Sequence, residues 1–524
     1  MRSFFDWFRE QEFGAEQPWL IFGKGPSFGV RKQYDLRQFK TIALNHAVRE
    51  QTVTLAHVID LDVIHDCGES IEKNAEALVM PWVPHVNNSA GTKTVQELIG
   101  EVPLLQRLSL QGRLLCYNLS TTGRRFGNSP VVPVAWFSIE AALNLLAMAG
   151  VRRVRSLGID GGVAYANEFD DLKDKTLLRN GHESFDRQFA EIAKTIARTG
   201  IDYAPLNIDS PIRVYAGALE AQTLAVKVLE YSIRRHASMT VEVFPLYRAD
   251  IEVPMPRDPQ NEPRTPFSFQ RFLIPQLTGY RGRAIYLDSD MQVFGDLRQL
   301  WTMPFDGADL LAARSSDKAN RQPQFSVMVL DCDRLHWEIS EIISRLDGGD
   351  LTYESLMHEM SVAAEVSSGI GPEWNSLEHY DEGRTALVHY TDMTKQPWVS
   401  MANPLGYLWF RSLLDSIANG FVTVDEVKSQ VACGWVRPSL LYQIEHRVED
   451  SLSLPRRVRA LDDSFIPPFQ GLPHGADALG RRQQPNLLRL RTRRALQSTF
   501  RRLTLDRIGR SLRFRTRTWL DQLK

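Results

Sequence analysis

The sequence predicts an α/β protein with two successive α/β domains of the nucleotide-binding type. Apolar, strand-like runs alternate with helical patterns, and a fresh series of the same kind begins at Ile212. Several strand-like runs end in glycine, asparagine or aspartate, residue types that suit ligands at the carboxyl edge of a parallel sheet. Hydrophobic residues make up 43% of the 524 and charged residues 24%, the balance of a globular chain with sizeable cores.

The first domain is expected over residues 1–207, with a mainly parallel sheet. The clearest helix in it is IEAALNLLAMAG, predicted over 138–149 and ended by Gly150. The predicted strands cover 19–22, 41–44, 54–59 and 154–157.

The second domain is expected over residues 211–450. It opens with a strand at 212–217, a helix at 219–238 and an alternating strand at 240–246. A Pro/Gly-rich linker is predicted over 451–480, followed by a basic helical tail.

The basic tail, residues 481–524, holds fourteen Arg and Lys against two Asp, a net charge of +12. Because the whole chain has a net charge of −1, the other 480 residues sum to −13. Apolar residues recur along the tail at near-helical spacing, which predicts an amphipathic helix on an anionic membrane surface. The alternative is that this helix packs on the acidic body of the protein.

Composition favours a cytoplasmic enzyme, or one peripheral on the inner face of the membrane. The start of the chain lacks a secretory apolar run, and no apolar stretch is long enough to span a bilayer. The cysteines are widely spaced, which favours a reducing compartment and argues against a cysteine zinc site. They are Cys67, Cys116, Cys332 and Cys433.

The most informative segment is GRAIYLDSDMQVFGDLRQLW, residues 282–301. A short apolar run predicts a buried strand, and it ends in Asp288 and Asp290. Two carboxylates placed in this way can bind one Mg²⁺ or Mn²⁺, which in turn binds a diphosphate. Without further context, the same pair is more often the start of a solvated turn.

The context comes from three other segments. Arg271 lies in the helical pattern FSFQRFLIPQL that precedes the strand, where it is available to a phosphate or a sugar hydroxyl. His389 ends a short strand, with Lys395 six residues later. A histidine that completes a two-carboxylate site, with a lysine nearby, makes a coherent diphosphate clamp.

Residues 211–410 resemble glycosyltransferase family 8, whose members have the GT-A nucleotide-sugar fold. The likeness lies in the opening strand and helix, in FSFQRFLIPQLTGYRGRAIYLDSD, and in the His-to-Trp segment 389–398. It implies a retaining transferase with a UDP-sugar donor and Mn²⁺, or Mg²⁺, as cofactor. We expect the acceptor to be a glycan or a lipid-linked molecule of polysaccharide biosynthesis, and we expect no nucleic-acid partner.

The resemblance assigns a role to each of these residues. It makes Asp288, Asp290 and His389 metal ligands, and Arg271 and Lys395 contacts of the donor; Asp288, Asp290 and Lys395 are then the catalytic set. The chain departs from the family pattern in the late motif, where Asp392 replaces a glycine and Gln396 is inserted before Pro397. The family's Asp-Gln pair near the sugar is not recognisable, and Tyr353-Glu354 occupies roughly its place.

The first domain carries a weaker signal. Gly23, Gly25 and Ser27 form a loop after the first strand, where backbone amides can approach a phosphate. Asn45 and Asp160 follow other strands and are expected at the same edge of the sheet. A lone glycine loop is as often purely structural.

Residues 15–205 resemble bacterial sialyltransferase-like and pterin-pyrophosphokinase-like α/β domains. The order of motifs carries this likeness: Gly-x-Gly-Pro-Ser, then Asn, then Gly-x-Asp. It implies a donor-site serine at Ser138 and a general base at His182, and therefore a CMP-sugar. Three interpretations of the whole chain stay open beside the single transferase: a bifunctional transferase, a non-catalytic nucleotide- or glycan-binding scaffold, and a nucleotide-sugar hydrolase.

Overall fold

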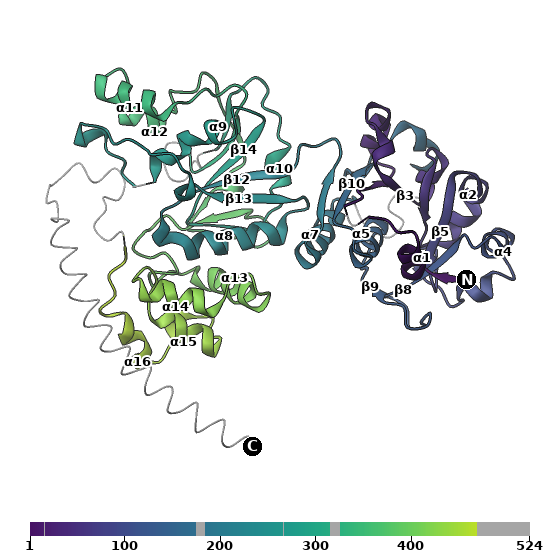
Figure 1. Cartoon of the computed structure of the whole chain (residues 1–524). Helices are drawn as coiled ribbons and strands as arrows, with labels where there is room; N and C mark the ends of the chain where they lie inside the picture. Colours follow the sequence, from purple (N-terminus) through teal and green to yellow (C-terminus); the bar gives the residue numbers. More distant parts are fainter. Residues whose placement is uncertain (15, 174–183, 266, 315–324, 469–524) are drawn as a thin grey trace. The chain divides into compact units, whose positions relative to one another are not determined.

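The computed structural model describes residues 1–14, 16–173, 184–265, 267–314 and 325–468. They contain two separate large sheets, one built before residue 206 and one after residue 211 (Figure 1). His182, the second half of the predicted linker and the whole predicted tail lie outside the described residues. No helix in the described ranges is long and apolar enough to cross a membrane.

The first sheet has nine strands in the described residues, in the order β1-β8-β5-β4-β3-β2-β10-β11, with β9 paired to β8. Every neighbouring pair is parallel, as the alternation of strands and helices predicts. The strands are β1 (Arg2–Ser3), β2 (Trp19–Phe22), β3 (Lys40–Leu44), β4 (Val53–His57), β5 (Ala75–Pro81), β8 (Leu114–Leu119), β9 (Val131–Val132), β10 (Arg153–Leu157) and β11 (Asp202–Pro205).

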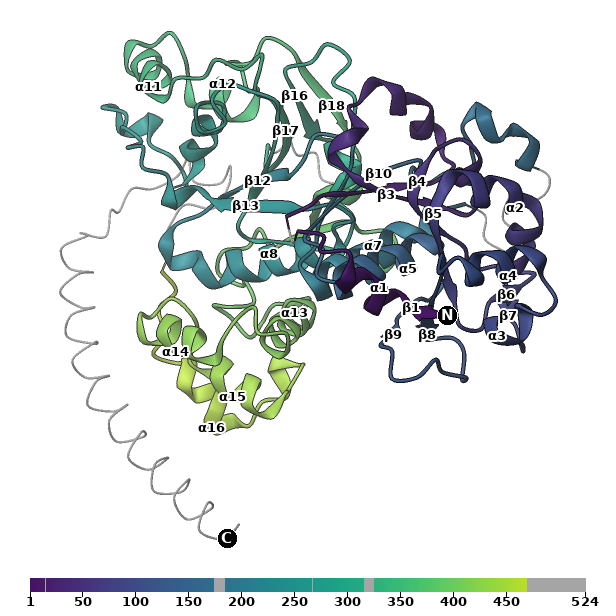
Figure 2. The same cartoon turned by 45° about the vertical axis from the view of Figure 1, so that its right-hand side comes forward.

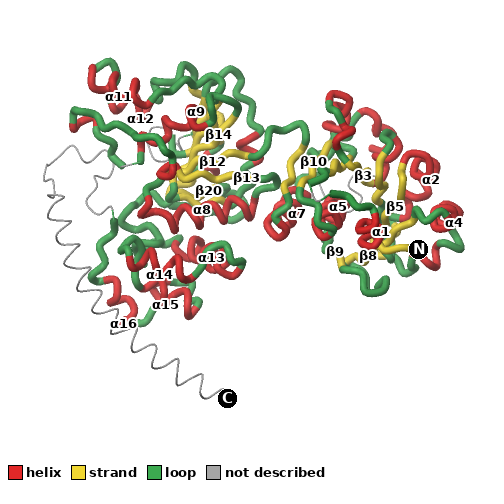
Figure 3. The backbone as a smooth tube through the Cα atoms, in the orientation of Figure 1, coloured by secondary structure: helices red, strands yellow, loops and turns green. Residues whose placement is uncertain are grey.

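Helices cover both faces of this sheet. On one face Trp19 and Ile21 share a core with α1 (Phe4–Glu10), α5 (Ser138–Met148) and α7 (Arg187–Thr199). On the other face Leu20 and Phe22 pack with α2 (Leu61–Asn74) and α4 (Pro103–Leu110). Because both faces are buried, the strands read as continuous apolar runs rather than alternating ones. Figure 3 shows the strands flanked by these helices.

The second sheet is mixed, in the order β13-β12-β14-β17-β16-β18. Its first three strands are parallel, whereas β17 runs antiparallel to β14 and to β16. A separate small sheet contains three strands in the order β15-β20-β19. The strands are β12 (Ile212–Gly217), β13 (Val241–Pro245), β14 (Arg283–Asp288), β15 (Met291–Val293), β16 (Leu310–Ala313), β17 (Val327–Asp331), β18 (Val366–Ile370), β19 (Ser376–Leu377) and β20 (Leu387–His389).

Helix α8 (Thr223–His236) covers one face of the second sheet, and its outer side packs on a further helical layer (Figure 2). That layer consists of α13 (Gly406–Ala418), α14 (Val424–Ala432) and α15 (Ser439–His446). The opposite face packs against the 3₁₀ helix η8 (Ser268–Leu273), α9 (Ile274–Leu277), α11 (Ile339–Gly348) and α12 (Tyr353–His358).

The predicted fold class is confirmed, with local differences. The helix predicted over 219–238 begins only at Thr223, after the short 3₁₀ helix η5 (Glu220–Gln222). The helical pattern at 267–277 divides into η8 and α9 because Pro275 has no amide hydrogen and fits only in a first turn. The described part of the predicted linker is not extended. It contains α16 (Arg456–Arg459), and the Asp462 carboxylate accepts hydrogen bonds from the backbone amide and the hydroxyl of Ser439.

Candidate functional site

The end of β14 delivers the two aspartates. This strand lies inside the sheet, and Asp288 pairs with Gly217 of β12. The backbone amide of Ser289 donates to the Gly217 carbonyl (3.0 Å), which turns the chain before β15. Both carboxylates are buried, with Asp288 9% and Asp290 7% exposed. Two buried acids one residue apart need a compensating positive group, since burial of a bare charge is costly.

His389 is one group that can balance the charge of these carboxylates. The antiparallel pairing of β15 with β20 sets Met291 opposite His389, which brings the imidazole to the aspartates. Its Nε2 atom lies 3.1 Å from Asp290 Oδ1 and 3.9 Å from Asp288 Oδ2. One ligand atom from each of the three residues lies within 4.8 Å of the others, which is the geometry of a cation site.

The electrostatics of the three residues fit a divalent cation. Burial raises the pKa of Asp288, and the neighbouring Asp290 raises it further. Burial opposes protonation of His389, but the two carboxylates outweigh it and raise the pKa of the imidazole. Asp290 Oδ1 is buried, and within the described residues no group other than the His389 imidazole donates a hydrogen bond to it. A cation in contact with this oxygen would satisfy it and relieve the repulsion between the acids.

Three further side chains surround the group, and none of them was predicted from the sequence to belong to the site. The Tyr286 hydroxyl donates to Asp288 Oδ1 (2.5 Å), and the Gln396 amide donates to Asp290 Oδ2 (2.8 Å). His389 Nδ1 lies 3.0 Å from the Asn375 side-chain oxygen. Tyr286 was detectable, because residues two apart in a strand point to the same face. Gln396 and Asn375 gave no such signal.

Arg271 lies in the site, but the fold holds much of its guanidinium. It is 6% exposed, with Nη2 3.6 Å from Asp288 Oδ1 and the guanidinium stacked over the Tyr286 ring. Its Nε and Nη1 atoms donate to the carbonyls of Ser268 and Phe325 (2.9 and 2.7 Å). The guanidinium therefore balances the buried carboxylate and ties it to the helix before β14.

The other expected contacts are arranged differently. Lys395 is exposed and forms an ion pair with Asp392 (2.9 Å), the residue that replaces the family's glycine. Tyr353 and Glu354 begin α12, where Arg264 stacks over the tyrosine ring and pairs with the glutamate (3.0 Å). Within the described residues, neither Tyr353 nor Glu354 has a recorded contact with Asp288 or Asp290.

Residues 221–341 match the model of glycosyl transferase family 8. The carboxy-terminal half therefore contains a domain similar to glycosyltransferase family 8. The matched segment includes Asp288 and Asp290, and His389 lies outside it but is brought to the aspartates by the β15–β20 pairing.

Individual relatives either match a short part of this chain or have a low sequence identity to it. Protein CDI of Arabidopsis thaliana is 33% identical over 92 residues, which are 17% of this chain and 36% of the relative; the chain thus spans about a third of that protein. Among solved structures, GlyE of Streptococcus pneumoniae TIGR4 is 18% identical over 39% of this chain and 60% of its own, with a TM-score of 0.30. The galactosyltransferase LgtC is 14% identical over 42% of this chain and 100% of its own, with a TM-score of 0.28.

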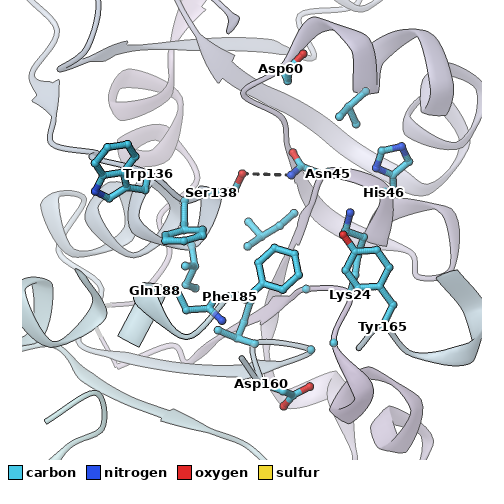
Figure 4. Close-up of a pocket in the computed structure, with 18 of the residues that line it drawn as sticks. Lys24, Asn45, His46, Asp60, Trp136, Ser138, Asp160, Tyr165, Phe185 and Gln188 are labelled. Carbon is cyan, nitrogen blue, oxygen red and sulfur yellow. Dashed lines mark hydrogen bonds between the residues drawn. The ribbon is translucent and has the colours of Figure 1, made fainter. Parts of the chain in front are cut away.

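A pocket of about 760 Å³ opens at the carboxyl ends of the strands of the first sheet (Figure 4). It brings together Gly23, Gly25, Asn45 and Asp160, four of the five residues predicted there, whereas Ser27 is not part of the wall. Ser138, also expected at this site, lines the pocket and accepts a hydrogen bond from the Asn45 amide (3.2 Å). The other labelled residues of the wall are Lys24, His46, Asp60, Trp136, Tyr165, Phe185 and Gln188.

The glycine loop is packed against the loop after β10. The Gly23 amide donates to the Leu157 carbonyl (2.8 Å) and the Gly25 amide to the Gly158 carbonyl (2.9 Å). The Ser27 amide donates to the Asp160 carboxylate (2.7 Å), and the Ser27 hydroxyl accepts from the Gly158 amide. These amides are therefore bonded within the protein, and the glycines serve the close approach of two loops.

The polar character of the pocket comes from side chains instead. The Lys24 ammonium lies 4.6 Å from the centre of the Tyr165 ring, and burial lowers its pKa to about 8. Asn45 Oδ1 and His46 Nδ1 are buried and make no hydrogen bond within the described residues. Lys24 and His46 are thus polar residues of this site that were not predicted, and each lies directly beside a predicted residue in the sequence.

Proposed function

We propose that this chain is a metal-dependent glycosyltransferase that moves a sugar from a nucleotide-diphosphate sugar to a glycan or lipid-linked acceptor. The convergence of His389 with Asp288 and Asp290, the two aspartates of the segment that matches the family 8 model, carries this proposal. The resemblance to the family supports a UDP-sugar, retention of configuration and Mn²⁺. The enzyme then acts in polysaccharide biosynthesis in the cytoplasm or on the inner face of the membrane.

The chain's own residues divide the work between binding and charge balance. Asp288, Asp290 and His389 would hold the cation, which neutralises the diphosphate as it becomes the leaving group. Arg271 keeps the Asp288 carboxylate in place, since its guanidinium lies 3.6 Å away and is held by two carbonyls. Lys395 can exchange its exposed partner, Asp392, for a donor phosphate, because a surface ion pair of this kind contributes little stability.

A screen of nucleotide sugars by thermal shift, with and without Mn²⁺, tests the proposal. A donor at a hundred times its dissociation constant stabilises the folded state by about 2.7 kcal/mol. We expect this gain to require both Mn²⁺ and the aspartates, so that it disappears in Asp290→Asn. A UDP-sugar that stabilises the protein equally with chelator present would contradict the metal assignment. Turnover that is unchanged by omitting every acceptor would instead indicate a hydrolase.

The pocket of the first sheet supports a second candidate activity. We propose that it binds a CMP-sugar-type nucleotide and makes the chain bifunctional. Its aromatic side chains can stack on a base, and Asn45 Oδ1 and His46 Nδ1 lack a hydrogen-bond partner. The Lys24 ammonium provides a positive group for a phosphate inside the pocket.

Binding of CMP to the Asp290→Asn variant tests the second site separately from the first. We expect CMP to raise the melting temperature without added metal, and Lys24→Met to abolish the effect. Lys32→Met is the matched control, because Lys32 is an exposed lysine of the 3₁₀ helix that follows Lys24, η1 (Pro26–Gln33), and does not line the pocket. Equal CMP binding by wild type and Lys24→Met would remove the lysine from the site. If CMP does not bind, the proposal that this pocket is a nucleotide-sugar site is wrong.

A further inference from the structure

Each side chain of the cation site has two polar atoms, and the two atoms have different neighbours. In Asp288, Oδ1 accepts from the Tyr286 hydroxyl, and Oδ2 is the atom nearer His389. In Asp290, Oδ2 accepts from Gln396, and Oδ1 faces His389. One atom of each residue is therefore held from outside and the other is directed inward.

The same division applies to the imidazole. Nδ1 of His389 lies 3.0 Å from the Asn375 side-chain oxygen, which can only accept a hydrogen bond. Nδ1 therefore donates to Asn375, and Nε2, which lies 3.1 Å from Asp290 Oδ1, is the ring nitrogen available to a cation.

Gln396 is the most constrained of the outer side chains. It is 2% exposed, and its amide nitrogen donates both to Asp290 Oδ2 (2.8 Å) and to the Tyr390 carbonyl (3.1 Å). Both amide hydrogens are therefore used, and the first bond rotates the Asp290 carboxylate so that Oδ2 is turned away from His389. Gln396 also joins the residue after His389 to the Asp290 side chain.

The chain around Gln396 is anchored from the helical layer. Arg437, which is 2% exposed, donates from Nε to the Pro397 carbonyl (3.1 Å), and its backbone amide donates to the Trp398 carbonyl (2.9 Å). The segment that follows Gln396 is therefore fixed by two hydrogen bonds to a residue just before α15. Such anchoring leaves the amide of Gln396 little freedom to leave Asp290.

We propose that Gln396 and Asn375 are positioning residues that hold the Asp290 carboxylate and the His389 imidazole in the orientation in which they bind the cation. The inference rests on the proposed metal-dependent function. Side chains that are already oriented lose less rotational freedom when they bind the cation, so binding is tighter. The two residues touch the ligands and not the substrate, so their effect should appear first in cation affinity.

Binding of Mn²⁺ to the full chain, followed by electron paramagnetic resonance, tests this directly. We expect Gln396→Leu to weaken Mn²⁺ binding about 10- to 100-fold, the usual effect of losing an outer partner of a ligand. The spectrum of bound Mn²⁺ should also change, because the Asp290 carboxylate is then no longer held in one orientation. Asn375→Leu should weaken binding by a similar factor, and Asn375→Asp should restore it, because a carboxylate oxygen also accepts from Nδ1.

Gln292→Leu is the matched control. Gln292 is a buried glutamine that also contacts Tyr390, by accepting from its hydroxyl (2.7 Å), but its amide donates to Leu408 and Ser412 rather than to an aspartate. We expect this variant to lose stability and keep its Mn²⁺ affinity. If wild type binds Mn²⁺ and the Gln396→Leu and Asn375→Leu variants bind it with the same affinity and spectrum, the inference is wrong. A wild-type protein that binds neither Mn²⁺ nor Mg²⁺ would instead overturn the proposed function itself.

Discussion

Replacement of Gly23 with alanine distinguishes a glycine that serves packing from one that serves a phosphate. A Cβ atom at this position would lie 2.2 Å from the Gly158 carbonyl oxygen and 2.6 Å from Ile159 Cδ1. The first contact is with backbone, so the two loops must separate. Overpacking of this kind costs about 1–3 kcal/mol. Separation also strains the hydrogen bonds from Gly23 to Leu157 and from Gly25 to Gly158, each with a net value of about 1 kcal/mol.

A destabilisation of about 3 kcal/mol lowers the melting temperature of a domain of about 200 residues by roughly 6–12 °C. Differential scanning calorimetry of the full chain should therefore show an earlier first transition in Gly23→Ala. Gly29→Ala is the matched control, since nothing lies within 4 Å of its Cβ position and its φ is not in the left-handed region. It should change stability by less than about 1 kcal/mol, in the stabilising direction. An unchanged transition in Gly23→Ala, together with lost CMP binding, would refute the packing role.

Other perturbations have equally definite outcomes. Asp288→Asn or Asp290→Asn should abolish metal-dependent transfer with circular dichroism unchanged; near-wild-type activity in either variant, or in chelator, would refute the metal assignment. His389→Ala should weaken Mn²⁺ binding, whereas Lys395→Ala should weaken donor binding with Mn²⁺ affinity intact, as titration calorimetry can resolve. Acid should destabilise the protein, because burial lowers the pKa of His46 to about 4 and of His57 to about 3. At pH values between the unfolded pKa of about 6.5 and these folded pKa values, only the unfolded chain binds the protons. Each histidine therefore lowers the free energy of unfolding by about 1.4 kcal/mol for each pH unit of acidification in this window. In urea titrations, His57→Gln should reduce this dependence of stability on pH. Removal of residues 469–524 should abolish flotation with anionic liposomes, and equal behaviour of the full chain and the truncation would exclude a membrane role for the tail.

Much of the cation site could be predicted because its parts carry strong local signals. The apolar run before Asp288 identifies a buried strand, and the Asp-x-Asp at its end identifies the chemistry. The first-domain loop shows the limit of such reasoning. Gly23, Gly25 and Ser27 match a phosphate loop in sequence, yet their amides are bonded to Leu157, Gly158 and Asp160. A glycine pattern indicates a close approach of the backbone, but it does not distinguish a phosphate ligand from another loop of the protein as the contacting group.

The sequence by itself determined the two α/β series, their buried strands, and the residue types at the strand ends, because burial and strand periodicity act over a few neighbouring residues. The tertiary structure decided which of those residues meet. The register that sets Met291 opposite His389 places the imidazole beside the aspartates, and the path of the chain after His389 brings Gln396 onto Asp290. Lys395, one residue earlier, reaches Asp392 instead. Such distances depend on strand pairing and on loops anchored from elsewhere in the fold, as Arg437 anchors Pro397, and no local pattern of residues encodes them.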